Sequence, residues 1–100
     1  MLVAAFAIAT WGLSLVLAPS REYQQGYRAG RTEAEAEWAA GTPSYYITGD
    51  GSYGLIGELD PETGLPCKPI AGCIVDDHIW GREEGHNRRI RELLATRASR

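Results

Sequence analysis

The residue types most able to do chemistry gather in the last third of the chain. His78, Glu83 and His86 are close in sequence, and Glu83 and His86 have the Glu-x-x-His spacing used in di-iron helical bundles. Such a bundle site needs two of these motifs and two further carboxylates, whereas this chain has one motif. This mismatch argues against a metal site, and His78, Glu83 and His86 are the candidate ligands if one is formed. The competing interpretation is that Asp76 or Asp77 caps a helix and His86 lies on its apolar stripe.

The two cysteines, Cys67 and Cys73, are spaced C-x₅-C, which matches neither a C-x-x-C redox motif nor a zinc knuckle. In an extended segment they would lie about 20 Å apart, so a disulfide requires the chain to fold back at Pro69 or Gly72. We expect a Cys67–Cys73 disulfide if this region is exported and free thiols if it is cytoplasmic.

Residues 49–54 form a G-x-G-x-x-G string. A dinucleotide-binding fingerprint needs a helix directly after it, and Gly57 and Pro61 forbid one here. The string resembles the glycine-rich loop of protein kinases, but Lys68 stands in Cys-Lys-Pro rather than V-A-I-K, and no H-R-D or D-F-G follows. A glycine-rich hairpin turn is the better interpretation. No catalytic residue and no cofactor are predicted.

Periodicity and turn residues predict a small α+β protein with a three-stranded antiparallel meander between two helices. Ser20 is the expected N-cap of the first helix, and Gly41 is its expected stop. Pro66 and Pro69 place the first half of the third strand at an edge or outside the ladder. The expected elements are an apolar N-terminal helix, a helix from about 20 to 40, strands over 44–48, 52–59 and 65–75 (its regular part 71–75), a turn at 60–64, and a helix from about 78 to 96.

Glycines recur every four residues on both predicted soluble helices, and their cost within a helix indicates close packing. These helix faces could pack on each other, on the sheet, or on a second copy of the chain. Glu33, Glu35 and Glu37 are expected to face mostly outward. The predicted interaction face comprises Tyr23, Gly26, Tyr27, Gly30, Trp38, Gly81 and Gly85.

Residues 2–18 carry no charged side chain, and a helix of that length would span roughly 25 Å. Three interpretations compete: a retained single-pass membrane anchor, a cleaved signal peptide, and a buried core helix. Arg21, Arg28 and Arg31 follow the segment, which predicts a membrane protein with its C-terminal domain in the cytoplasm. Cleavage after Ser20 would instead give a secreted or periplasmic domain. The expected organisation is a hydrophobic segment at 1–20, an α+β domain at 21–96 and a frayed tail at 97–100.

The net charge is −3, with an acidic middle between two more basic ends. This charge argues against nucleic-acid binding, and it predicts that the ends lie against the acidic middle. The favoured function is a non-enzymatic, membrane-tethered accessory protein that contacts the membrane through residues 1–20 and a protein partner or second copy through its glycine-faced helices. The alternatives are an exported domain stapled by Cys67 and Cys73, and a small metal-dependent enzyme that uses His78, Glu83 or His86.

Overall fold

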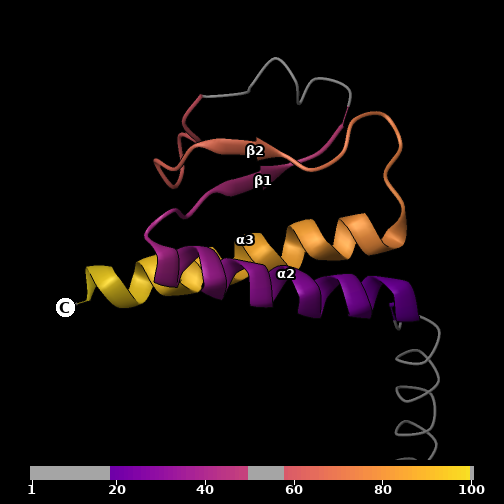
Figure 1. Ribbon diagram of the computed structural model, residues 1–100, viewed down its shortest axis with the longest axis horizontal. Coiled ribbons are helices and arrows are strands. Elements are labelled where there is room, and N and C mark those ends of the chain that lie inside the picture. The colour runs from indigo at the N-terminus through magenta and orange to yellow at the C-terminus, as the bar shows by residue number, and fades with distance from the viewer. Residues whose placement is uncertain (1–18, 50–57, 100) are drawn as a thin grey trace, which may run out of the picture.

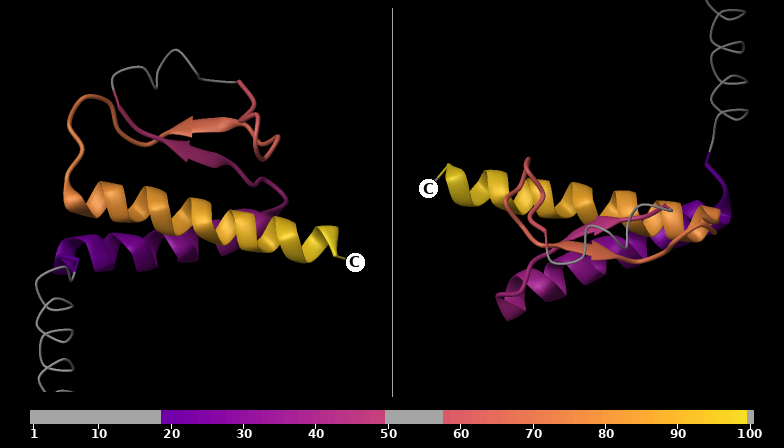
Figure 2. Two further views of the ribbon diagram at one scale, coloured as in Figure 1. Left: turned by 180° about the vertical axis from the view of Figure 1, so that it is seen from behind. Right: turned by 90° about the horizontal axis from the view of Figure 1, so that it is seen from above.

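A computed structural model of the chain describes residues 19–49 and 58–99, which form a helix pair covered on one side by two short strands. Helices α2 (Arg21–Ala40) and α3 (Asp77–Ala98) lie side by side and run in the same direction (Figure 1). Strands β1 (Tyr45–Ile47) and β2 (Cys67–Pro69) occupy the long connection between them. Two further views show the strands as a second layer over the helix pair (Figure 2).

Helix α2 begins and ends at the residues predicted from the sequence. The Ser20 side chain accepts a hydrogen bond from the Tyr23 backbone N–H at 3.1 Å, which satisfies a first-turn donor. At the other end Gly41 takes a left-handed conformation, with φ 76°, and its N–H binds the Trp38 carbonyl. The predicted helix over 20–40 is thus confirmed.

Helix α3 begins after Asp76, whose carboxylate accepts the Ile79 N–H at 2.8 Å. The sequence left Asp76 and Asp77 as alternative caps, and the structure selects Asp76. The helix runs two residues beyond the predicted end at Thr96.

The two helices meet backbone to backbone at four glycines. Gly26, Gly30, Gly81 and Gly85 are all buried, and a Cβ added to any of them would come within 3.0 Å of backbone atoms of the other helix. The glycine Cα–H groups therefore face carbonyls of the opposite helix, such as those of His78 and Tyr27. Of the three packing alternatives for the glycine faces, the structure shows that they pack on each other.

The side-chain pairs on one side of this contact fix a parallel register. Tyr23 binds Glu84, Arg88 binds Tyr27, and Arg31 binds Glu92, with a constant separation of 61 positions. Because two parallel helices cannot be joined by a short turn, the chain between them must cross the full length of the pair. That crossing segment supplies the strands.

The predicted three-stranded antiparallel meander is wrong. The described residues hold a two-stranded parallel sheet, in which Tyr45, Tyr46 and Ile47 align with Cys67, Lys68 and Pro69. The turn residues predicted hairpins between neighbouring strands, whereas β1 and β2 run in the same direction, and two parallel strands cannot be joined by a hairpin turn. The predicted strand over 52–59 falls largely outside the described residues; Leu59 forms an isolated antiparallel bridge with Pro66.

The third predicted strand is also placed differently. It lies over the proline-containing half, residues 67–69, and residues 71–75 are not a strand. In a parallel ladder alternate N–H groups point away from the partner, so Pro69 can occupy an outward position without costing a bond. The turn at 60–64 is confirmed: Gly64 has φ 73°, and the Asp60 carboxylate accepts the Glu62 and Thr63 N–H groups.

The predicted single-pass membrane localisation, with its transmembrane helix or signal-anchor, is corrected by the structure. Over residues 19–49 and 58–99, no helix is both long enough and apolar enough to cross a membrane. The expectation depended on the apolar run at 2–18, which lies outside the described residues.

The glycine contact predicts that Gly→Ala lowers stability, whereas helix propensity alone predicts that it raises stability. At an exposed helix position, Gly→Ala stabilises by about 1 kcal/mol. We expect Gly30→Ala to destabilise the protein instead, by about 1–3 kcal/mol, because the new methyl group meets the Arg82 and His86 backbone. Chemical denaturation measures this change. Thr32→Ala, on the exposed side of α2, is the control and should shift stability by less than about 1 kcal/mol. A more stable Gly30→Ala protein would contradict the packing.

Candidate functional site

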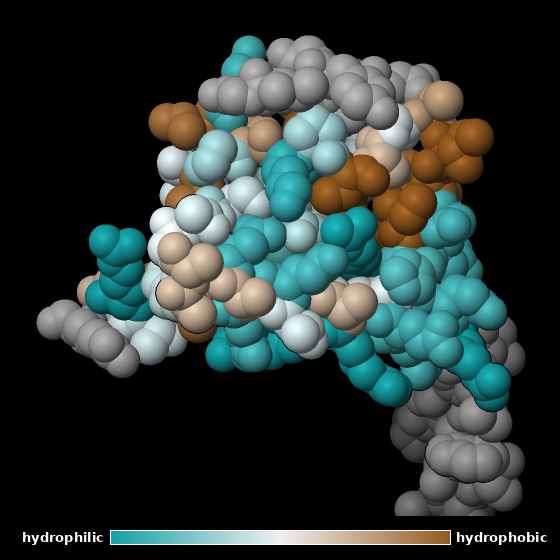
Figure 3. Space-filling model, in the orientation of Figure 1, coloured by the Kyte–Doolittle hydropathy of each residue, from teal (hydrophilic) through white to brown (hydrophobic). Residues whose placement is uncertain are grey.

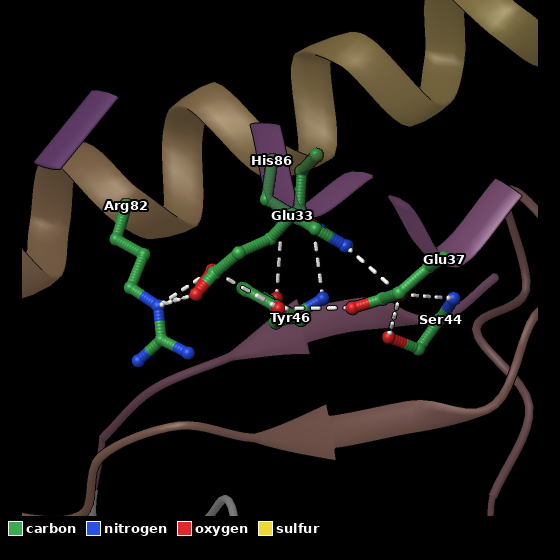
Figure 4. A network of polar contacts seen from close by, with 7 residues as sticks. Glu33, Glu37, Ser44, Tyr46, Arg82 and His86 are labelled. Carbon is green, nitrogen blue, oxygen red and sulfur yellow. Dashed lines mark hydrogen bonds and ion pairs between the residues drawn. The ribbon is translucent and has the colours of Figure 1, made fainter. Parts of the chain in front are cut away.

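A network of polar side chains lies between the helix pair and β1, centred on the Glu37 carboxylate (Figure 4). Its Oε1 atom accepts from the Ser44 backbone N–H at 3.0 Å, from Ser44 Oγ at 2.7 Å and from His86 Nε2 at 3.1 Å. Its Oε2 atom accepts from the Tyr46 hydroxyl at 2.9 Å. One carboxylate on α2 thus holds α3, β1 and the segment that joins α2 to β1.

His86 and Tyr46 form the buried centre of the network. Their rings stack with centroids 3.4 Å apart and planes 2° apart, and the exposed fractions are 0% and 1%. His86 Nδ1 lies 2.9 Å from Asn87 Oδ1, while Nε2 faces Glu37. Each ring nitrogen of His86 therefore faces a side-chain oxygen, and the imidazole links Glu37 on α2 to Asn87 on α3.

Asn87 binds the outer edge of β1 as a neighbouring strand would. Its Oδ1 accepts the Tyr46 N–H, and its Nδ2 donates to the Tyr46 carbonyl, each at 2.8 Å. On the other side of the sheet, the Cys67 N–H donates to Glu58 O, and Pro69 has no N–H to offer. Both edges of the sheet are therefore already occupied or blocked, which disfavours addition of a strand from a partner.

Arg82 and Glu33 extend the network along the helices. Arg82 Nε binds both Glu33 carboxylate oxygens, at 2.9 and 2.7 Å, and its guanidinium lies 5.4 Å from the centre of the Tyr46 ring. Arg89 pairs with Glu35 at 3.0 Å. The basic α3 thus lies against the acidic half of α2, as the charge pattern predicted.

The electrostatics of the network follow from this geometry. Burial alone would raise the pKa of Glu37, but hydrogen bonds from Ser44, His86 and Tyr46 outweigh it and hold that pKa below its ordinary value. Burial and the hydrogen bond to Glu37 raise the pKa of Tyr46 far above its ordinary value. The network therefore keeps Glu37 ionised and Tyr46 neutral.

The network contains a serine, a histidine and a carboxylate, but they are not connected as a nucleophilic triad. In a triad the histidine lies between the nucleophile and the carboxylate. Here Glu37 lies between Ser44 and His86, and both Ser44 and His86 are buried. Every buried side-chain nitrogen and oxygen in the described part of the chain has a hydrogen-bond partner. The arrangement can hold elements together, but it leaves no activated nucleophile facing solvent.

The candidate metal ligands are not brought together. His78 is exposed in the first turn of α3, Glu83 accepts from Thr48 Oγ1 at 2.6 Å, and His86 is enclosed by Glu37, Tyr46 and Asn87. Within residues 19–49 and 58–99, no three histidine, cysteine, aspartate or glutamate side chains are grouped to hold a metal ion.

The cysteines lie in and after β2. Cys67 is half-buried and Cys73 is exposed, and both are free thiols in the structure. The disulfide predicted for an exported form stays a prediction.

A second candidate site lies on the outer side of the helix contact, which we call the aromatic face: Tyr23, Tyr27, Trp80, Glu84 and Arg88. The two tyrosine rings are 6.1 Å apart. Glu84 accepts from the Tyr23 hydroxyl and, at 2.7 Å, from Trp80 Nε1, while Arg88 donates to the Tyr27 hydroxyl at 3.3 Å. Burial and then the bond to Glu84 raise the pKa of Tyr23 to about 12. Trp80, Glu84 and Arg88 are exposed and the two tyrosines are half-buried, and all five side chains are held by hydrogen bonds.

The structure divides the predicted interaction face into three parts. Its four glycines are buried within the helix contact, and Tyr23 and Tyr27 lie beside that contact on the aromatic face. Trp38 is three turns further on, about 16 Å from Tyr27 along the helix, in a groove with Pro43 and Leu93. Trp38 is therefore not part of the aromatic face.

Sequence reasoning missed most of the polar network. It placed Glu33 and Glu37 outward, but both point toward β1 and α3. It did not single out Ser44, Tyr46, Arg82 or Asn87. One usable signal was present: Glu33 and Glu37 are four residues apart, on the same side of α2, as are Arg82 and His86 on α3.

Comparison with models of protein families, with curated proteins and with solved structures gives no match in any of the three.

Asn87→Ala should destabilise the protein strongly, because it leaves the buried N–H and carbonyl of Tyr46 without partners. Each such group costs about 1–3 kcal/mol. Asn87→Asp keeps the acceptor for the Tyr46 N–H and loses only the donor, although it also introduces a charge. Denaturant titration of the two variants measures the difference between them. If Asn87→Ala unfolds at the same denaturant concentration as the unmodified protein, Asn87 does not serve as the edge partner of β1.

The lowered pKa of Glu37 predicts a specific acid sensitivity. Because the pKa is lower in the folded state than its ordinary value of 4.5, the Glu37 contribution is fully present above that value. It is lost as the pH falls through the folded-state pKa. The free energy of unfolding should therefore fall in acid less steeply for Glu37→Gln than for the unmodified protein. Glu35→Gln, at an exposed position, is the control. Equal slopes for all three proteins would contradict the assignment.

Proposed function

We propose that this protein is a non-catalytic interaction protein and that the aromatic face is its contact surface. The observation that carries the proposal is a set of accessible aromatic side chains fixed by hydrogen bonds: Trp80 is 56% exposed, yet its indole N–H is held by Glu84. Tryptophan, tyrosine and arginine are the residues most enriched among those that dominate binding energy.

The position of the aromatic face also supports binding. It spans both helices, at levels where their backbones are in direct contact, so a partner would meet one rigid surface. A surface already held in its binding conformation loses less conformational entropy on association. The other large exposed apolar residues, Leu59 and Ile74, lie in the connecting segments, where Figure 3 shows hydrophobic residues beside the strands.

The buried network argues for the same class of function. Its carboxylate, imidazole and hydroxyl groups bind one another, and these hydrogen bonds join α2, β1 and α3. The blocked sheet edges disfavour recruitment of a partner strand, so the outer helix surface is the better contact.

Site-specific photocross-linking in the source cells tests the proposal. A photoreactive phenylalanine analogue at position 80 should give a discrete protein adduct, whereas the same analogue at Ala36 should not. Ala36 is exposed on α2, away from the aromatic face. The adduct from position 80 should disappear when Tyr23→Ala and Tyr27→Ala are added. Absence of an adduct at position 80, or equal adducts at both positions, would contradict the assignment.

A further inference from the structure

We propose that the groove lined by Arg28, Arg88, Tyr23 and Tyr27 binds a carboxylate group on an acidic segment of a partner protein. This inference rests on the proposed function and names the chemistry of the partner. The groove lies between the start of α2 and the middle of α3 and is also lined by Pro19 and Gln24.

Arg28 and Arg88 differ in their ion pairing from the arginines that lie between the two helices. Arg31, Arg82 and Arg89 form ion pairs between α2 and α3 at 3.1, 2.7 and 3.0 Å. Within the described residues, Arg28 has no ion pair, and the only ion pair of Arg88 is a 3.9 Å contact with Glu92. The Arg88 side chain is 67% exposed. Most of the hydrogen-bond donors of these two guanidinium groups therefore remain available at the groove.

Tyr27 adds a third donor between the two arginines. Its hydroxyl oxygen accepts from Arg88 at 3.3 Å, so its own hydrogen can be donated to a ligand. Gln24 contributes less, because its amide nitrogen is bound to the Pro19 carbonyl. The groove thus presents two guanidinium groups and one hydroxyl, all able to donate to a single acceptor group.

The charge that lines the groove favours an anion, because, among the described residues, its only charged lining residues are Arg28 and Arg88. Glu84, on the aromatic face, is not in that lining, and its oxygens are bound by Tyr23 and Trp80. Planar guanidinium groups bind carboxylates through paired hydrogen bonds, and the tyrosine rings provide apolar surface for the methylene groups of a glutamate side chain.

The charge of the whole chain favours a protein segment over a nucleic acid. The net charge is −3, and a long polyanion would be repelled by the acidic residues elsewhere. A short acidic segment places its charge only at the groove, where it meets Arg28 and Arg88. The expected partner sequence therefore has one or two acidic residues beside an apolar residue that can pack against the exposed Trp80 ring.

Fluorescence anisotropy with a labelled peptide that carries one Glu-Glu-Leu unit between glycine and serine residues tests the inference on the full chain. The peptide should bind the unmodified protein, and the same peptide with glutamine in place of glutamate should not. Arg28→Gln combined with Arg88→Gln should weaken binding about tenfold or more, because it removes both charged donors from the groove. Tyr27→Phe should weaken it less, because it keeps the ring and loses one donor.

The matched control is Arg97→Gln, which removes the same kind of charge in the last turn of α3, outside the groove. Arg97 is exposed and forms no ion pair within the described residues. Its loss should leave peptide affinity within about twofold. An equal loss of affinity in Arg97→Gln, equal binding of the glutamine peptide, or tighter binding of a single-stranded DNA of similar length would overturn the inference.

The same experiments separate the two proposals. If position 80 cross-links to a partner but the acidic peptide does not bind, the interaction function stands and the carboxylate site is wrong. If neither result is obtained, both proposals fail. Circular dichroism of each variant shows whether it has kept its helices, and Arg28→Gln alone, at an exposed position, provides a variant that leaves the helix contact intact.

Discussion

The rest of the structure depends on the direct contact between the backbones of α2 and α3 at four glycines. Gly26 and Gly30 face the first turns of α3, and Gly81 and Gly85 face the first turns of α2, so the helices run parallel. Parallel helices need a connection that crosses the pair from end to end, and β1 and β2 lie in that connection. The same close approach brings Tyr23 and Tyr27 beside Glu84 and Arg88 and so creates the aromatic face.

A second consequence concerns the core. Glycines supply contact but little apolar area, and the buried apolar side chains of the described residues are Ala34, Tyr46 and Ile90. The Glu37 network supplements this small core, because its hydrogen bonds join three elements. Each satisfied hydrogen bond makes a modest net contribution to the stability of the fold. Buried polar groups in such a network must all find partners, and Ser44 and Asn87, which are 7% and 5% exposed, are both hydrogen-bonded.

The features that the sequence predicted correctly are helix ends and a turn, which depend on residues close together in the chain. Ser20, Gly41, Asp76 and the turn at Gly64 act through their own backbone conformations or side-chain bonds, and all four were placed correctly within the alternatives considered. The four-residue glycine spacing predicted close packing, but periodicity cannot say which surface is packed or in which direction. The direction and pairing of the strands could not be predicted in the same way, because an antiparallel meander and a parallel pair use the same strand-forming residues. Glu37 and Asn87 were missed because their roles require β1 to lie against the helix pair, which is a tertiary property.

The most direct test of the central claim is a nuclear Overhauser measurement between the α protons of the helix-contact glycines and the backbone amides of the opposite helix. The parallel contact predicts cross-peaks from Gly26 to the Arg82 amide and from Gly30 to the His86 amide, because those nitrogens are among the three atoms of α3 nearest to each glycine. Cross-peaks from Gly26 to the His86 amide and from Gly30 to the Arg82 amide, with none from Gly26 to the Arg82 amide, would show antiparallel helices. That result would contradict both the fold and the aromatic face built on it.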